Sequence, residues 1–251
     1  MTKAYISVEN VSISFGTVKA LNDVNLFVNQ GEIFGLIGSD GAGKSTLLRL
    51  LATMMKPSSG EMRIAGIDVV KQSREIKNII GYMPQRFGLY QDLTVEENMR
   101  FFMDIFGIRS GQRKSRMEKY LGFSNLLPYL KRPAGKLSGG MKQKLGLACV
   151  LVHEPDVLIL DEPTNGVDPV SRKEFWDILL DMKSEGKTIV VSTAYLDEGE
   201  LCGNVALMHK SQIIRTGSPG QISMGYKNLE DAMVEILSAV DEELKSDSFK
   251  R

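Results

Sequence analysis

One glycine-rich segment constrains the fold of this chain more than any other feature. It comprises Gly38, Ser39, Asp40, Gly41, Ala42, Gly43, Lys44, Ser45 and Thr46. The apolar stretch 32–37 before it is typical of a buried strand, and the leucines and methionines after it have helical spacing up to Pro57. In this order, backbone N–H groups surround phosphate oxygens, Lys44 adds a cation and Ser45 offers a hydroxyl to Mg²⁺. The segment therefore predicts a phosphate-binding loop in an α/β sheet.

Two carboxylates follow a second apolar stretch. Residues 157–160 predict a buried strand, and Asp161 and Glu162 come directly after it. Ligands bind at the carboxyl ends of strands in open α/β sheets, so this pair is expected beside the phosphate loop. Asp161 suits the Mg²⁺ shell, and Glu162 is placed to act as general base on an attacking water. Two acids after a strand also occur in solvated turns, but the phosphate loop favours the functional interpretation.

A second candidate anion site lies before another predicted helix. Ser138, Gly139 and Gly140 precede apolar residues at helical spacing, which places them at a helix N-terminus. A serine N-cap with a flexible approach is the simpler interpretation of the same residues. One nucleotide does not need both this site and the phosphate loop.

The remaining pattern predicts a P-loop α/β fold with two additions. The N-terminal stretch 6–28 alternates like antiparallel strands, and Thr94 with Glu97 forms a capping box that opens a helical region reaching His153. Further elements are predicted at 169–185 (helix), 188–192 (strand), 205–208 with 212–215 (hairpin) and 229–244 (helix). We expect a parallel-sheet core with an N-terminal antiparallel β-subdomain and an inserted helical subdomain. The expected domain is 1–225, with its core at 1–85 and 154–225 and the helical subdomain at 86–153, followed by a C-terminal helix and tail at 226–251.

Charge and composition limit the kinds of partner that the chain is expected to bind. Basic and acidic residues number 31 each, so the chain has no net charge that favours nucleic acid. Cys149 and Cys202 lie far apart with no metal-ligand spacing, which predicts that the protein is located in the reducing cytoplasm. The apolar runs are shorter than the roughly 20 residues that cross a bilayer, and the N-terminus lacks a signal-peptide core. Any membrane association is therefore expected to depend on another chain.

The motifs together resemble the ATP-binding cassette (ABC) family. The residues that carry the resemblance are 38–46, Gln85, 137–141, Asp161-Glu162 and Asp168, in the order and spacing of that family. The resemblance implies ATP and Mg²⁺ as cofactors, with Ser45, Gln85 and Asp161 at the metal and Glu162, Lys44 and Gln85 in catalysis. It also implies that Ser138, Gly139 and Gly140 contact the ATP of a second cassette in trans, in a homodimer or with a tandem partner.

Three further positions match the family one by one. Phe15 matches the aromatic residue that stacks on adenine, although a strand aromatic in the core is an equally good interpretation. Gln85 matches the glutamine that reaches Mg²⁺ and the attacking water and senses the membrane partner. Asp168 matches the aspartate of the D-loop.

Two positions depart from the family pattern. Met141 stands where the signature has glutamine, and Ala194 stands where the family has a switch histidine that contacts the γ-phosphate. Alanine cannot make that contact, which puts the rate of hydrolysis in question. There are two explanations for Ala194. It is native if the chain is the first half of a two-cassette protein, in which the tail at 241–251 would lead to the second cassette. Alternatively, it is an engineered replacement of histidine.

The amino-acid sequences of these motifs resemble those of bacterial multidrug-type exporter ATPases. The resemblance implies an ATP-hydrolysing subunit, held at the inner face of the cell membrane by transmembrane permease subunits, that powers export through dimerisation of cassettes. Two alternatives are a regulatory, low-turnover cassette of a tandem transporter and an ABC ATPase without a transport role. The second alternative is disfavoured because no sustained heptads lie between Gln85 and Leu137.

Overall fold

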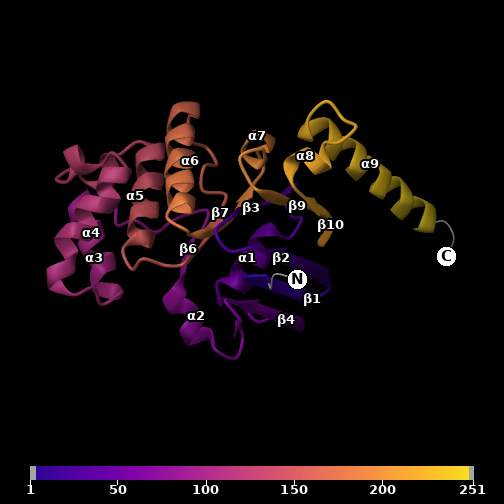
Figure 1. The fold of residues 1–251 in the computed structure, drawn as a ribbon, viewed down its shortest axis with the longest axis horizontal. Helices are drawn as coiled ribbons and strands as arrows, with labels where there is room; N and C mark the ends of the chain where they lie inside the picture. Colours follow the sequence, from indigo (N-terminus) through magenta and orange to yellow (C-terminus); the bar gives the residue numbers. More distant parts are fainter. Residues whose placement is uncertain (1–3, 249–251) are drawn as a thin grey trace.

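A mixed six-stranded sheet forms the frame of the chain in a computed structural model that describes residues 4–248 (Figure 1). Its strand order is β10-β9-β3-β8-β7-β6, parallel except for the β9–β10 hairpin. The strands are β3 (Ile33–Gly38), β6 (Ile80–Met83), β7 (Val157–Asp161), β8 (Thr188–Thr193), β9 (Asn204–His209) and β10 (Gln212–Gly217). Every residue of β3, β7 and β8 is buried, as expected for strands covered on both faces. The predicted α/β fold is confirmed.

A second, antiparallel sheet has the strand order β2-β1-β4-β5. Its strands are β1 (Ile6–Phe15), β2 (Val18–Val28), β4 (Ser59–Ile64) and β5 (Ile67–Asp68). The β1–β2 pairing agrees with the predicted N-terminal antiparallel sheet. The strands β4 and β5 were not predicted, because Met62 and Ile64 are the only fully buried side chains of β4 and leave a weak alternation.

Helices pack on both sheets. They are α1 (Lys44–Leu51), α2 (Ser73–Ile79), α3 (Val95–Ile105), α4 (Ser110–Phe123), α5 (Gly139–Leu151), α6 (Pro169–Ser184), α7 (Leu196–Gly199), α8 (Pro219–Ile222) and α9 (Leu229–Ser248), with short 3₁₀ turns at Leu127–Tyr129 and Ala134–Lys136. Between β6 and β7 the chain forms α3, α4 and α5, which lie at the left of Figure 1. In the predicted capping box, Thr94 N donates to Glu97 Oε2 at 2.8 Å. Within residues 4–248, no helix combines the length and apolar character that a membrane crossing requires.

The helix after the glycine loop is shorter than predicted. It ends at Leu51, whereas the methionines at 54 and 55 suggested that it continues to Pro57. Thr53 adopts a φ of 60°, which is incompatible with a continuing right-handed helix, and Met54 is 63% exposed. The terminal helix was predicted at 229–244 and is observed to reach Ser248; the end of the expected tail, 249–251, lies outside the described residues.

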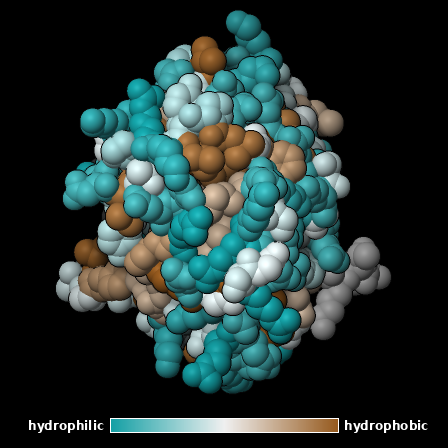
Figure 2. Space-filling model, turned by 90° about the vertical axis from the view of Figure 1, so that its left-hand side faces the viewer, coloured by the Kyte–Doolittle hydropathy of each residue, from teal (hydrophilic) through white to brown (hydrophobic). Residues whose placement is uncertain are grey.

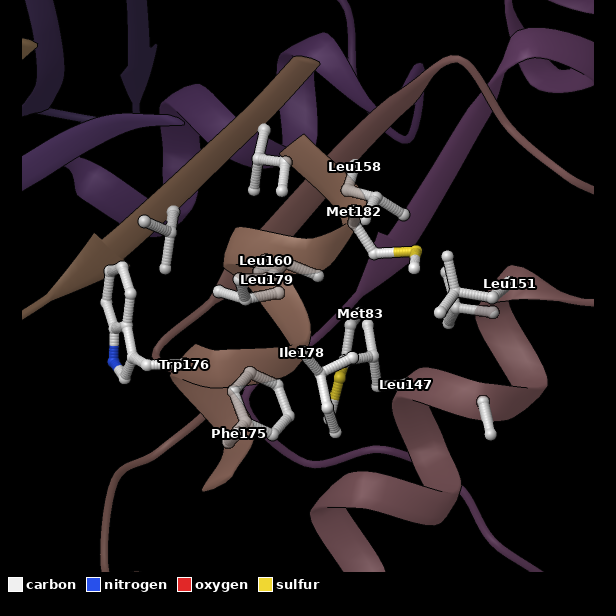
Figure 3. Close-up of a cluster of buried hydrophobic side chains, with 14 of the residues drawn as sticks. Met83, Leu147, Leu151, Leu158, Leu160, Phe175, Trp176, Ile178, Leu179 and Met182 are labelled. Carbon is white, nitrogen blue, oxygen red and sulfur yellow. The ribbon is translucent and has the colours of Figure 1, made fainter. Parts of the chain in front are cut away.

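Two apolar layers hold the central sheet in place. On one face, α6 contributes the predicted side chains Phe175, Ile178, Leu179 and Met182, together with Trp176, which was not predicted. Figure 3 shows these residues near Met83 of β6, Leu158 and Leu160 of β7, and Leu147 and Leu151 of α5. On the other face, α1 and the antiparallel sheet form a second cluster. The carboxyl ends of β3, β7 and β8 are thereby fixed side by side.

Candidate functional site

The glycine loop joins the end of β3 to the start of α1. Gly41 and Gly43 have φ values of 78° and 106°, a region that side-chain-bearing residues rarely adopt. A Cβ on Gly43 would lie 2.7 Å from Ala20 O, and one on Gly38 would overlap Met208 O. The loop therefore lies directly against β2 and β9, with a backbone that needs glycine at these positions.

Lys44 extends back across this loop. Its side chain is 4% exposed, and Nζ donates to Gly38 O at 2.7 Å and to Ser39 O at 3.2 Å. Nζ also lies 3.3 Å from Glu162 Oε1. The structure thus places the predicted cation and the predicted base in direct contact.

Asp161 ends β7 beside the first turn of α1. Its Oδ1 accepts hydrogen bonds from Ser45 Oγ at 2.9 Å and from Ser192 Oγ at 2.9 Å. Its Oδ2 is buried and has no hydrogen-bond partner among the described residues. A hydroxyl beside a carboxylate oxygen without a partner suits Mg²⁺, which prefers oxygen ligands.

Glu162 lies one residue further along in a left-handed conformation, with φ of 46°. Such a conformation is strained in a residue other than glycine and is held by surrounding contacts. The backbone N–H donates to Ser192 Oγ at 3.0 Å, while Oε2 accepts from Gln85 Nε2 at 2.9 Å and Asn165 Nδ2 at 3.2 Å. Gln85 and Glu162, predicted from separate motifs, are therefore in contact.

Most of these side chains line one hollow of about 430 Å³; Asp161 is not in its lining but bonds Ser45, which is. Its lining residues are Val18, Lys19, Ala20, Asp40, Gly41, Ala42, Gly43, Lys44, Ser45, Thr46, Gln85, Glu162, Asn165 and Ser211. Phe15 lies outside this lining but is the strand partner of Val18. Its side chain is 52% exposed, so the interpretation of Phe15 as a core aromatic is wrong. Its stacking on adenine remains a prediction.

The predicted signature residues do not line this hollow. Ser138 caps α5 by accepting a hydrogen bond from Met141 N at 3.3 Å, and Ser138 and Gly139 are exposed. Gly140 packs so closely on α6 that an added Cβ would overlap the side chain of Ser171. The chain therefore does not bring its own signature to its own phosphate loop.

Asp168 also lies outside the hollow, where it caps α6. Its Oδ1 accepts from Ser171 N at 2.9 Å, and this backbone hydrogen bond lowers the pKa of the Asp168 carboxyl below its usual value. The predicted contact of Asp168 with a nucleotide remains untested.

Three residues near the site were not predicted. Ser192 Oγ donates to Asp161 Oδ1 and accepts from the backbone N–H of Glu162, and Asn165 Nδ2 donates to Glu162 Oε2. Glu198 is 2% exposed and accepts hydrogen bonds from Thr164 Oγ1 and Thr193 Oγ1. The signal that could have found Ser192 and Thr193 is their position at the end of an apolar strand, where parallel strands bring polar ends together.

Ala194 follows β8 and lies beside the predicted base. It lines a small hollow together with Glu162, Thr164, Asn165, Thr193 and Tyr195. The position predicted to hold the switch residue is therefore next to Glu162, and alanine offers no hydrogen-bonding group there.

Comparison with known proteins gives one consistent picture. Residues 21–165 match the sequence family described as ABC transporter. The chain is 48% identical over 200 residues to the probable multidrug ABC transporter ATP-binding protein YbhF of Escherichia coli, covering 80% of this chain and 35% of YbhF. It is 37% identical over 203 residues to the ABC transporter ATP-binding protein NatA of Bacillus subtilis, covering 80% of this chain and 82% of NatA. The chain thus spans about a third of the length of YbhF.

Solved structures agree with the sequence comparison. An ATP-binding subunit of an ABC transporter superposes with a TM-score of 0.83 at 28% identity, covering 93% of this chain and 99% of the other. The cassette MJ0796, in a dimeric post-hydrolysis state bound to ADP and Pi, superposes with a TM-score of 0.76 at 26% identity, covering 85% and 98%. With the geometry of the glycine loop and the two acids, these relationships show that the chain belongs to the ABC transporter family as an ATP-binding cassette.

Proposed function

We propose that this chain binds Mg²⁺ and ATP in the hollow at the glycine loop and hydrolyses the ATP to power a membrane exporter. The observation that carries the proposal is the contact between the start of α1 and the acids at the end of β7: Lys44 Nζ lies 3.3 Å from Glu162 Oε1, and Ser45 Oγ donates to Asp161 Oδ1 at 2.9 Å. A cation, a metal-binding carboxylate and a base are the groups that phosphoryl transfer to water needs.

Each residue has a distinct role in this proposal. The N–H groups of the loop and Lys44 hold the β- and γ-phosphates, and Ser45 and Asp161 hold Mg²⁺. The metal, when bound, supplies positive charge that offsets the charge of the phosphates. Glu162 accepts a proton from the attacking water, and its hydrogen bond with Gln85 keeps the carboxylate facing the hollow.

The position of the signature supports a second cassette. Ser138 and Gly139 are exposed at the N-terminus of α5, outside the lining of the hollow. A helix N-terminus attracts phosphate, so these residues could complete the site of a second cassette. The related MJ0796 cassette is dimeric. Whether the partner is a second copy or a tandem cassette, the proposal requires the signature to act in trans.

The helical region 86–153 supports a membrane partner. Figure 2 shows the face that bears α3 and α4, where hydrophobic side chains gather within a largely hydrophilic surface. The large hydrophobic residues exposed in this region are Tyr90, Ile105, Phe106, Leu127 and Tyr129. Exposed apolar surface marks interaction sites, and we assign the hydrophobic surface in Figure 2 to a transmembrane permease that holds the chain at the inner face of the membrane. YbhF is a probable multidrug transporter protein, which suggests a drug-like or lipidic cargo.

A second candidate function is a regulatory cassette that holds ATP and cleaves it slowly. The observation in its favour is Ala194 beside Glu162, where the side chain cannot donate or accept a hydrogen bond. This alternative keeps the nucleotide site and changes only its turnover.

The test is binding and hydrolysis of ATP by the purified chain in the presence of Mg²⁺. We expect the wild-type chain to bind ATP and Lys44→Ala to lose most of that binding, whereas Lys71→Ala, at an exposed lysine outside the hollow, keeps it. The chain is also expected to copurify with a multi-span membrane protein encoded beside it. An absence of ATP binding in the wild-type chain contradicts the proposal.

A further inference from the structure

The turn between β9 and β10 connects the nucleotide hollow to the terminal helix. Lys210 and Ser211 form this turn with φ values of 43° and 70°, in the left-handed region that favours glycine. Two such residues in succession store strain, so the turn depends on contacts from its surroundings. Those contacts lie on two sides.

On one side the turn holds the glycine loop. Ser211 N donates to Ala42 O at 3.2 Å, and Ser211 Oγ donates to Lys19 O at 2.6 Å. Ser211 O accepts a hydrogen bond from Asn22 N at 2.8 Å. Ser211, Ala42 and Lys19 all line the hollow, so the turn forms part of its wall.

On the other side the turn is bound by α9. Asp241 Oδ1 lies 2.6 Å from Lys210 Nζ and 2.8 Å from His209 Nε2. These two neighbours lower the pKa of Asp241 to about 2, so the carboxylate is charged at neutral pH. One carboxylate oxygen of α9 thus binds the last residue of β9 and the first residue of the turn.

We propose that Asp241 is a positioning residue for nucleotide binding: by holding His209 and Lys210, it keeps the turn in the conformation that braces the glycine loop. The contact from Ser211 N to Ala42 O transmits this restraint to a loop whose backbone must surround the phosphates. A loop held in its binding conformation loses less entropy when the nucleotide binds. This inference rests on the proposed ATP site and adds control of its affinity by the terminal helix.

The experiment measures the affinity of the full chain for a non-hydrolysable ATP analogue with Mg²⁺, by titration calorimetry. Asp241→Asn is expected to weaken binding roughly two- to thirtyfold, the range of couplings transmitted through packed contacts. Asp241→Glu is expected to restore most of the affinity, because the carboxylate remains. Glu235→Gln is the matched control: it removes the same charge from an exposed residue of α9 that has no ion pair among the described residues.

A variant on the turn tests the same link from its other end. Lys210→Ala is expected to weaken binding by a similar factor, and the double variant with Asp241→Asn is expected to be no weaker than either single variant. In hydrolysis assays, these variants should raise KM for ATP and leave kcat nearly unchanged.

The outcomes separate the two proposals. If the wild-type chain does not bind the analogue, the proposed function fails. If the wild-type chain binds and Asp241→Asn binds equally well, the role of Asp241 is overturned while the ATP site stands. Equal losses in Asp241→Asn and Glu235→Gln also overturn it, because they show an effect of helix charge alone.

Discussion

Lys44 Nζ and Glu162 Oε1 lie 3.3 Å apart, and both side chains are almost wholly buried. The proposed phosphate-binding cation is therefore paired with the proposed base. A phosphate that binds Lys44 competes with Glu162 for the same ammonium group. Removing one partner of a buried pair leaves the charge of the other uncompensated, so a change at Glu162 also alters how Lys44 binds phosphate.

Glu162→Gln should accordingly separate binding from hydrolysis. The amide cannot accept the proton of the attacking water, so hydrolysis should fall by about 100-fold or more. Because the amide also competes less for Lys44, affinity for ATP should rise. Single-turnover hydrolysis and equilibrium binding measure the two effects. Glu200→Gln, at the exposed residue that follows α7, should change neither. An unchanged rate in Glu162→Gln would exclude Glu162 as the base.

Asp161→Asn should remove the dependence of ATP binding on Mg²⁺. The change keeps the size of the side chain but removes the negative charge of the carboxylate. Its Oδ2 atom has no hydrogen-bond partner among the described residues. Affinity in the presence of Mg²⁺ should fall by roughly tenfold or more, whereas affinity in the presence of a chelator should stay close to that of the wild type. Asp156→Asn, before β7, is the control. Equal losses with and without Mg²⁺ would argue against a metal at Asp161.

Ala194→His should raise turnover if the missing side chain limits the rate. A histidine at this position would lie beside Glu162 and could donate a hydrogen bond to the γ-phosphate. A well-placed donor should accelerate single-turnover hydrolysis by about tenfold or more. Ala194→Leu adds bulk without a donor and should give no gain. No acceleration with histidine would favour a cassette whose slow turnover has another cause.

Local signals explain how much could be predicted from sequence. The loop between β3 and α1 and the acids after β7 were found because each lies within one short segment of strand and turn. The strand β4 was missed because its pairing with β1 depends on residues about 50 positions away, and β5 was missed with it because β5 pairs with β4. The hydrogen bond from Ser192 to Asp161 depends on β8 lying next to β7, which no local pattern specifies. Contacts between distant segments therefore marked the limit of prediction.

The two signature glycines should respond differently to alanine. A Cβ on Gly140 overlaps the side chain of Ser171, whereas one on Gly139 has no atom within 4 Å. Gly140→Ala should lower the free energy of unfolding by about 1–3 kcal/mol through overpacking. Gly139→Ala should leave stability nearly unchanged but lower hydrolysis if Gly139 approaches a partner's phosphate. Denaturant unfolding and ATPase assays distinguish the two. Full ATPase activity in Gly139→Ala would remove the support for its proposed role in trans.

The pH dependence of stability should be traceable to His153. Its ring stacks on Phe106 with centroids 4.0 Å apart, Nε2 lies 2.9 Å from Ile80 O, and Nδ1 is buried without a hydrogen-bond partner among the described residues. Burial lowers the pKa of His153 below 6.5, because the charged ring is poorly solvated there.

The sign of the effect follows from linkage. The folded chain binds a proton at His153 less readily than the unfolded chain, so this contribution is present above about pH 6.5 and is lost as the pH falls below it. The melting temperature should therefore drop between pH 7.5 and pH 5.5. In His153→Gln that drop should be smaller, although the overall stability is lower without the stacking on Phe106. An equal drop in the wild type and His153→Gln would assign the effect to other groups.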